Sequence, residues 1–402
     1  MNKHNMNYYG IIAEYNPFHL GHKDQIRMVK EEMGADLVAV VMSGHFLQRG
    51  IPAIVDKWTR ARMAVEGGAD LVIELPVRFS LSSSDDFSDA SLLLLSSLGV
   101  NKLCFGSEPG FLSNLSEYAA RICEDPAYDA RMREYLDEGH SYVKANELAL
   151  SSLTGNAVKL PPNALLGLSY CKSIRKYGLN IEAVPIERWG AGYHELDLHA
   201  KHPSAEGIRT CLAQHIIDWP ALKEALPKTS YELLFAQHRY LYEQDFYKQI
   251  VSFVFSLGKD GMREIKGVKE GLENKIFEAA LNTVQFDEML GWINSRRYTS
   301  SSIRRILFSC LLGIGEFDLR EAPELRYHRI LAMSKRGRAY LSEKKGDASF
   351  QPIVNFARDR KRFRLREDDF KYDVRATAIY ATQCESIRAN SDYLLKPYLS
   401  DS

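Results

Sequence analysis

Two histidines near the start of the chain have the types and the spacing that phosphate chemistry needs. His19 and His22 stand in the run EYNPFHLGH, residues 14–22. Two imidazoles can donate hydrogen bonds to phosphate oxygens while charge builds up in a transition state. Gly21 between them has no side chain, so a purine ring could pack directly on the backbone there. Zinc is the alternative, but a zinc site needs a third and a fourth ligand and none is evident nearby, so we expect no metal site on the chain.

The position of this run strengthens the phosphate interpretation. It follows an apolar run of strand length, Tyr8–Glu14, and precedes a helical pattern at Gly21–Met33. In an open parallel sheet, ligands bind beyond the carboxyl ends of the strands, and the N-terminus of the next helix favours anions. The chain has no G-x-x-x-x-G-K-[ST] motif and no G-x-G-x-x-G after the first strand, which disfavours a P-loop ATPase and a dinucleotide oxidoreductase.

The elements that must position these residues alternate between strand and helix in the first half of the chain. Continuous apolar strands separated by helices predict a Rossmann-like parallel sheet covered on both faces. The expected strands are Tyr8–Glu14, Asp36–Met42, Leu71–Leu75, Lys102–Phe105 and Ile181–Ile186. From about residue 204 the pattern is mainly helical. We therefore predict an α/β catalytic domain over residues 1–215 and a mainly helical domain over residues 216–402.

Glycines and polar residues follow the other expected strands as well. The loop Ser43–Gly50 follows the second strand, and Gly106 follows the fourth. Because the carboxyl ends of parallel strands meet at one rim, these residues together are a site hypothesis, although ordinary turn chemistry explains some of them, Glu74 among them. The loop could hold a small carboxylate or shield an intermediate from water. Its candidate contacts are Ser43, Gly44, Gln48 and Arg49.

The composition is that of an ordinary soluble globular protein. The chain has 402 residues, of which 45% are hydrophobic and 26% charged. Its six cysteines lack metal-ligand spacing, which indicates buried thiols in a reducing compartment. The N-terminus lacks the apolar core of a signal peptide, and no apolar stretch reaches the roughly 20 residues of a membrane helix. We expect a cytoplasmic protein.

Lys and Arg equal Asp and Glu at 52 each, but the basic residues gather late in the chain. Residues 296–366 hold 18 Lys and Arg against 7 Asp and Glu, with aromatic residues between them. Phosphate neutralisation needs cations and unstacked bases stack on aromatic faces, so this region predicts RNA binding, although any one cluster could be a solvated helix face. The candidate contacts are Arg296, Arg297, Arg304, Arg305, Lys335 and Arg336. A third basic cluster spans Arg358–Arg366.

Taken together, the motifs resemble those of the bacterial tRNA(Met) cytidine acetate ligase family, within the HIGH-motif nucleotidyltransferase group. The resemblance rests on EYNPFHLGH, VMSGHFLQRG, DLVIELP and FGSE, then LPPNALLG, RWGAGYH and RYT, and covers roughly residues 8–345. It implies an enzyme that makes acetyl-adenylate from acetate and ATP, with Mg²⁺ expected beside ATP. The acetyl group then goes to N4 of the wobble cytidine of elongator tRNA(Met), giving N4-acetylcytidine.

The resemblance also implies which residues act. His19 and His22 would stabilise charge on the α-phosphate, and Arg188 could neutralise phosphate oxygens. The implied ATP contacts are Ile12, Ala13, Glu14, Tyr15, Asn16, Pro17, Phe18, His19, Leu20, Gly21, His22, Lys23, Asp24, Gln25, Gly106, Asn163 and Arg188. All agree with the strand-end argument except Asn163, which the pattern places at the start of a helix.

The sequence departs from the family pattern at a second phosphate motif. The family pattern S-A-[ST]-x-I-R becomes SAEGIR at residues 204–209, so Ser204 and Arg209 remain candidate contacts, while Glu206 would put an acid near phosphates. Separately, Met333-Ser334-Lys335 matches part of the K-M-S-K-S loop of synthetases. No strand is expected before it, and we interpret this match as coincidence.

Two other functions stay open at this point. A plain adenylyltransferase acting on a small phosphorylated coenzyme precursor would share the histidine site without needing the basic helical half. A non-catalytic RNA-binding protein could keep the fold, but it would not need His19, Gly21 and His22 together.

Overall fold

One mixed sheet organises the computed structural model, which describes residues 6–187, 203–269, 271–295, 298–317, 319, 323–347 and 350–401. Its strands within these residues are β1 (Tyr8–Ala13), β2 (Leu37–Ser43), β3 (Leu71–Leu75), β4 (Lys102–Ser107), β5 (Glu182–Glu187), β6 (His328–Met333), β7 (Pro352–Ile353) and β8 (Tyr398–Leu399). Their order is β5-β4-β1-β2-β3-β6-β7, and β8 pairs with β6. The first five strands are parallel, whereas β6 runs antiparallel to β3. The predicted α/β parallel sheet is confirmed, and each of its five expected strands lies within two residues of its predicted bounds.

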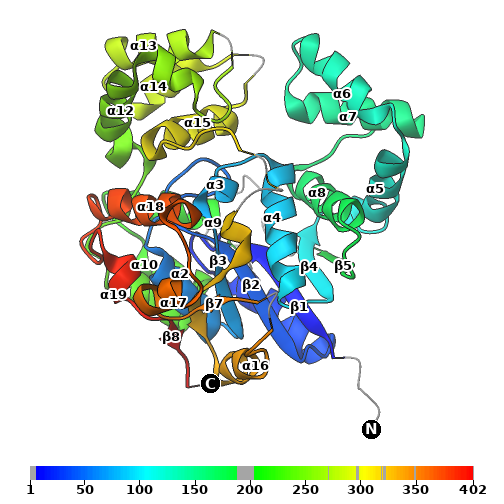
Figure 1. Cartoon of the computed structure of the whole chain (residues 1–402), viewed down its shortest axis with the longest axis vertical. Coiled ribbons are helices and arrows are strands. Elements are labelled where there is room, and N and C mark those ends of the chain that lie inside the picture. The colour runs from blue at the N-terminus through cyan, green and yellow to red at the C-terminus, as the bar shows by residue number, and fades with distance from the viewer. Residues whose placement is uncertain are drawn as a thin grey trace.

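Helices cover both faces of this sheet (Figure 1). Within the first part of the chain they are α1 (Leu20–Arg27), α2 (Lys57–Glu66), α3 (Val77–Ser80), α4 (Ser84–Ser97), α5 (Leu115–Glu124), α6 (Tyr128–Asp137), α7 (Tyr142–Thr154), α8 (Pro162–Lys176), α9 (Ala205–Leu212), α10 (Trp219–Ala225) and α11 (Lys228–Phe235). Those that follow are α12 (Glu243–Arg263), α13 (Leu272–Asn282), α14 (Phe286–Ile293), α15 (Ser300–Leu312), α16 (Lys335–Glu343), α17 (Phe356–Arg362), α18 (Lys371–Ala381) and α19 (Ser391–Leu394). A π-helical turn, η1 (Met28–Glu32), extends α1.

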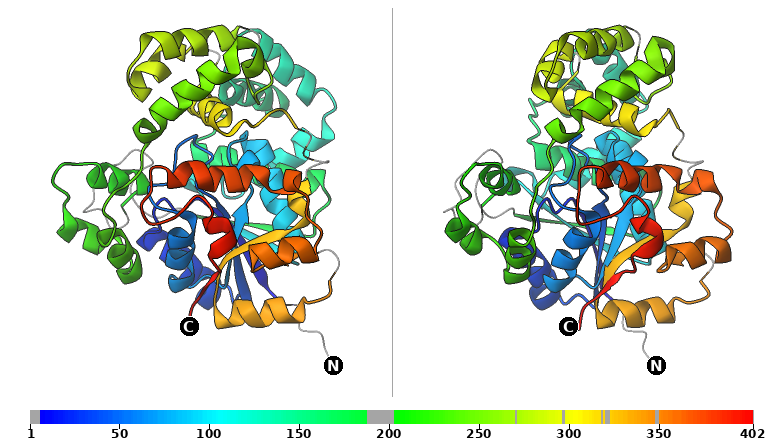
Figure 2. Two further views of the ribbon diagram at one scale, coloured as in Figure 1. Left: turned by 60° about the vertical axis from the view of Figure 1, so that its left-hand side comes forward. Right: turned by 90° about the vertical axis from the view of Figure 1, so that its left-hand side faces the viewer.

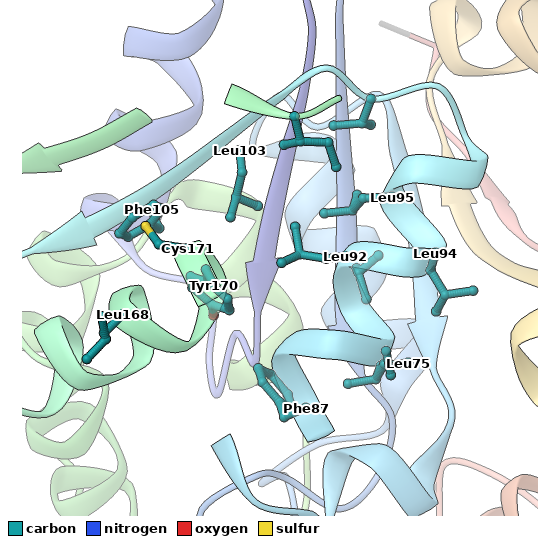
Figure 3. Packing of buried hydrophobic residues seen from close by; sticks show 14 of the residues in the cluster. Leu75, Phe87, Leu92, Leu94, Leu95, Leu103, Phe105, Leu168, Tyr170 and Cys171 are labelled. Carbon is teal, nitrogen blue, oxygen red and sulfur yellow. The ribbon is translucent and has the colours of Figure 1, made fainter. Parts of the chain in front are cut away.

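Burial on both faces explains why the strands are continuously apolar. Every residue of β2 is buried, and its alternate residues belong to two different hydrophobic cores. Figure 3 shows the core on one face, where Leu92 and Leu95 of α4 lie beside the sheet. On the same face, Phe105 of β4 meets Tyr170 of α8 edge to face, with 5.4 Å between ring centroids. The central strands of the sheet are therefore covered on both faces by packed side chains, whereas the edge strand β5 is only partly buried.

The second half of the chain is mainly helical but also completes the sheet. Helices α12–α15 form a lobe at the top of Figures 1 and 2, and the apolar core of this lobe also includes Phe46, Val77 and Tyr380 from other parts of the chain. The chain then returns to add β6, β7 and β8 to the sheet. The expectation that no strand precedes Met333-Ser334-Lys335 is therefore wrong, because β6 ends at Met333. The division at residue 215 remains a prediction, and the sheet itself extends across it.

Long apolar helices are missing from the described part of the chain. None of the helices there combines the length and the apolar character that crossing a bilayer requires.

Candidate active site

A cavity of about 860 Å³ opens at the carboxyl ends of the parallel strands. Its floor is the end of β1 and the start of α1, and its walls come from α4, α7, α8 and α9. The helical lobe closes another side through residues 298–309 of α15 and the turn before it. The cavity therefore lies where the sequence predicted a nucleotide, between the sheet and the helical lobe.

The two histidines form one unit at the floor of this cavity. Their rings stack with centroids 3.7 Å apart. His19 caps α1, and its Nδ1 accepts a hydrogen bond from Gly21 N at 3.1 Å. In return, His22 Nδ1 accepts from His19 N at 3.3 Å. An accepting Nδ1 leaves the ring proton of a neutral imidazole on Nε2, so the turn fixes both rings in the tautomer that donates from Nε2.

Buried aromatic rings hold His22 in place. Tyr15 is 2% exposed and Phe18 is fully buried. The Tyr15 ring meets the His22 ring edge to face at 4.8 Å between centroids, and Phe18 lies 5.7 Å from His22. Tyr15 adopts a left-handed φ of 47°, which few residues other than glycine adopt. Burial also raises the pKa of its hydroxyl, so Tyr15 supports the histidines as a neutral aromatic wall.

Glu14 ties the loop after β2 to the floor of the cavity. Its Oε1 accepts from Gln48 N at 2.8 Å, and its Oε2 lies 3.8 Å from Arg49 Nε. Gln48 and Arg49, both predicted as phosphate or acetate contacts, line the cavity. The Glu14 carboxylate therefore connects the loop after β2 to the turn that carries the histidines.

Ser43 and Gly44, predicted as contacts of the same kind, lie behind the cavity and are not part of its lining. The fully buried Arg60 of α2 binds their carbonyl oxygens, donating to Ser43 O at 3.1 Å and also to Gly44 O. The same guanidinium donates to Glu14 O at 2.7 Å. Arg60 thus joins the ends of β1 and β2. Burial lowers its pKa to about 10. This residue was not identified from the sequence.

Arg305, predicted as an RNA contact, lines the cavity wall. Its Nη1 donates to Gln48 O at 3.0 Å, and burial lowers its pKa to about 10. Gly50 (φ 72°) makes this approach possible, because a Cβ there would lie 2.5 Å from Arg305 N. The side chain therefore links the helical lobe to the loop after β2, and any contact with RNA would have to be made inside the cavity.

Asn163 and Gly106, predicted as ATP contacts, meet at the cavity wall formed by β4 and α8. Asn163 Nδ2 donates to Glu108 Oε1 at 2.9 Å, and Glu108 Oε2 accepts from Ala164 N at 2.9 Å. Glu108 thus caps α8 and orients the Asn163 amide. Asn163 reaches the site from a helix start, as the sequence indicated, because α8 begins at the same rim as the strand ends.

The second phosphate motif also reaches the cavity. Ser204 caps α9, accepting from Gly207 N at 3.0 Å, and both Ser204 and Arg209 line the cavity. Arg209 Nη1 donates to Asn16 O at 2.8 Å, and burial followed by nearby Arg49 lowers its pKa. Glu206 is not among the lining residues. The acid that departs from the family pattern therefore does not face the phosphate region.

The remaining predicted ATP contacts divide into two sets. Those that line the cavity are Ile12, Ala13, Glu14, Tyr15, Asn16, His19, Gly21, His22 and Gln25. Those that are not part of the lining are Pro17, Phe18, Leu20, Lys23 and Asp24. Arg188 lies outside the described residues, as do the predicted RNA contacts Arg296 and Arg297.

Two further predicted RNA contacts, Lys335 and Arg336, lie at the end of the sheet where the parallel strands begin, opposite the end that holds the cavity. Because β6 is antiparallel to β3, its last residue, Met333, pairs with Leu71 at the start of β3. Ser334 then caps α16 and binds Asp70 Oδ1 at 2.9 Å. This placement, below the sheet in Figure 1, keeps the resemblance to the synthetase loop away from the cavity. Arg304 lies on α15 with its Nε 3.4 Å from Glu243.

No group of three His, Cys, Asp or Glu side chains in the described part of the chain could hold a metal ion. The imidazoles, guanidinium groups and helix N-termini that line the cavity favour anion binding.

Gly21→Ala tests the histidine turn. The added Cβ would lie 3.0 Å from His19 Cε1 and 3.2 Å from His19 Nδ1, so the ring has to shift. We expect phosphate chemistry at this site to slow by about 10- to 100-fold, because small misplacements of catalytic groups are costly. Stability should not fall, since alanine favours helices more than glycine does. Gly110→Ala is the matched control, as nothing lies within 4 Å of its Cβ position. Equal rates for both variants would contradict the role given to the turn.

Comparison with known proteins agrees with this geometry. The sequence model of the HIGH Nucleotidyl Transferase family matches residues 6–393. The chain thus has the fold of a HIGH-type nucleotidyltransferase and belongs to that class of protein.

More specific relatives lie within this class. The chain is 35% identical to the tRNA(Met) cytidine acetate ligase of Clostridium novyi (strain NT), over 98% of this chain and 99% of the relative. It is 36% identical to that of Clostridium perfringens, over 98% and 100%. The crystal structure of apo TmcAL from Thermotoga maritima superposes with a TM-score of 0.90 at 28% identity, covering 99% of this chain and 100% of that one. A second structure of that protein, bound with alpha-thio ATP, gives a TM-score of 0.88. The chain belongs to the tRNA(Met) cytidine acetate ligase family.

Proposed function

We propose that this chain is an ATP-dependent ligase of the cytoplasm that acetylates N4 of the wobble cytidine in elongator tRNA(Met). The observation that carries the proposal is the stacked histidine pair, held in its Nε2-donating form at the floor of a nucleotide-sized cavity. Family membership supplies the substrates, since the relatives are named for tRNA(Met), cytidine and acetate.

In the first half-reaction, an acetate oxygen attacks the α-phosphorus of ATP, and the bond from that phosphorus to the pyrophosphate oxygen breaks. Negative charge grows on the phosphate oxygens during this step. His19 and His22 donate to those oxygens from Nε2, in positions that the fold sets before ATP arrives. Arg209, fixed by Asn16 O, and Arg49, beside Glu14, add positive charge at the same cavity.

In the second half-reaction, the cytidine amine attacks the acetyl carbonyl carbon, AMP leaves and the amine gives up a proton. This amine is a poor nucleophile because its lone pair is delocalised into the ring. Adenylation compensates for the poor nucleophile by giving the acetyl group a good leaving group, AMP. Tyr298 and Ser302 of the helical lobe line the cavity and would lie beside the cytidine as it meets the acetyl-adenylate.

Magnesium fits this proposal as a partner of ATP. Mg²⁺ keeps several waters and binds substrate phosphates, with few protein carboxylates. The described residues offer no group of three acidic, histidine or cysteine side chains for a metal. Glu14 is the carboxylate at the cavity floor nearest the histidine turn in sequence, and it would be the residue to approach such an ion.

Incubation with ATP, labelled acetate and bulk tRNA tests the proposal directly. We expect label on RNA, recovered as N4-acetylcytidine after digestion, and AMP and pyrophosphate as co-products. ATP–pyrophosphate exchange that needs a different acid would contradict the assignment of acetate. Adenylyl transfer to a small phosphorylated molecule, with no label on RNA, would favour the coenzyme-precursor alternative.

A further inference from the structure

A ridge of cations on α17 and in the turn that follows it has no part in the cavity. Five of its side chains are exposed, and the ridge is defined here by them: Arg358, Lys361, Arg362, Arg364 and Arg366. The first and last pair with carboxylates of their own segment, Arg358 with Asp359 at 2.7 Å and Arg366 with Asp369 at 3.6 Å. Within the described part of the chain, no carboxylate lies within ion-pair distance of the middle three. The centre of the ridge therefore presents concentrated positive charge to solvent.

The ridge has a rigid base. Phe356 and Phe370 beneath it are buried and meet edge to face at 4.9 Å between centroids. The buried Asp359 carboxylate accepts from Val354 N at 2.9 Å and Asn355 N at 2.8 Å, which fixes the start of α17. Cations on a fixed scaffold lose less freedom on binding than cations on a loose tail.

Arg364 occupies a backbone position that suits glycine. It has a left-handed φ of 54°, directly after α17 ends, and its side chain is exposed. Left-handed conformations disfavour residues with a Cβ, so glycine would satisfy this turn with less strain. An arginine here costs stability and adds a cation at the centre of the ridge. Strain of this kind points to a function for the side chain.

A path of packed helices joins the ridge to the cavity. Figure 1 shows α15, α18 and α17 one below the other, and α15 contacts α18 while α18 and α17 both contact α19. The α15 end of this path lines the cavity. The ridge is therefore connected to the cavity wall through helices that pack on one another.

We propose that the α17 ridge binds backbone phosphates of the tRNA, away from the nucleotide that is modified. The proposal rests on the function proposed above and identifies a second contact surface for the same substrate. RNA fits the ridge because phosphates repeat along a strand as the cations do along α17, and because such contacts need no base recognition.

Two substitutions test whether the positive charge of the ridge contributes to tRNA binding independently of any effect on protein stability. Arg364→Gly removes a cation and relieves the left-handed turn, so its melting temperature should stay equal or rise by about 1–2 °C. Arg362→Glu reverses an exposed charge that makes no ion pair with any described carboxylate. With both changes together, KM for tRNA should rise about 3- to 10-fold at roughly 0.1 M salt, and the slope of log KM against log salt should fall by about 1–2. The kcat and the acetate-dependent ATP–pyrophosphate exchange without tRNA should not change.

Lys223→Glu on α10 is the matched control, because Lys223 is exposed and no described carboxylate lies within ion-pair distance of it. It should leave KM for tRNA and the salt slope unchanged. The proposal is overturned if the α17 double variant behaves like this control. If the unaltered protein transfers no acetyl group to RNA, the proposed function fails, and filter binding of bulk tRNA then decides about the ridge. Weaker binding by the double variant supports the ridge, and equal binding overturns it.

Discussion

His22→Ala should abolish acetyl-adenylate formation while leaving the affinity for tRNA nearly unchanged. The imidazole is held by Tyr15 and by the backbone of His19 in the tautomer that donates from Nε2, at the floor of the cavity. Removing one preorganised donor of this kind costs roughly 10²- to 10³-fold in kcat. Here the loss should be larger, because His22 also orients its stacked partner. Acetate-dependent ATP–pyrophosphate exchange measures the first half-reaction, and filter binding measures tRNA affinity.

His238→Ala serves as the control, because His238 is an exposed histidine beyond the cavity lining. His22→Gln keeps a donor of similar reach and should recover part of the exchange rate. Loss of tRNA binding in His22→Ala, with exchange intact, would assign this histidine to the RNA site and refute its role at the α-phosphate.

The sheet and the histidine turn could be predicted from sequence because both depend on local patterns. Strands buried on two faces must be continuously apolar, and β2 meets that condition at every residue. His19 and His22 are three residues apart at a helix start, so their proximity follows from the geometry of a single turn. Gln48 and Arg49 reached the cavity for the related reason that parallel strands end at one rim.

What the sequence concealed depends on contacts between distant segments. Arg60 lies in α2, and nothing in the local sequence shows that it is fully buried among carbonyl oxygens. Glu74, interpreted as turn chemistry, is a buried strand residue that binds Lys57 at 2.7 Å. Strand β6 was missed because its pairing partner, β3, lies more than 250 residues earlier in the chain. Arg305 looked like surface charge because a run of arginines does not reveal which side chain the lobe turns inward.

Asp392→Ala should produce the largest loss of stability. Asp392 Oδ1 lies 2.9 Å from Lys57 Nζ and 2.7 Å from Arg329 Nη2, and all three side chains are at most 6% exposed. Glu74 completes the cluster, 3.3 Å from Arg329 Nε. These charges join α2, β3, β6 and α19. Helix α19, late in the chain, is thereby tied to α2 and β3, which come early in it. Removing one partner leaves buried cations uncompensated, at a cost of about 3–5 kcal/mol in the free energy of unfolding.

Chemical denaturation measures this loss, and pH provides a second test. Burial alone would raise the pKa of Asp392, but Arg329 and Lys57 outweigh it and hold the pKa below its ordinary value. A carboxyl whose pKa is lowered on folding stabilises the protein above its unfolded pKa of about 3.9 and loses that effect as pH falls further. The stability difference between the unaltered protein and Asp392→Asn should therefore shrink below about pH 4. Asp368→Ala removes an exposed carboxylate paired with Lys371 and should cost far less than Asp392→Ala, because exposed ion pairs contribute little to stability. If Asp392→Ala lowers the free energy of unfolding no more than this control does, the buried cluster does not stabilise the packing of α19 against α2, β3 and β6.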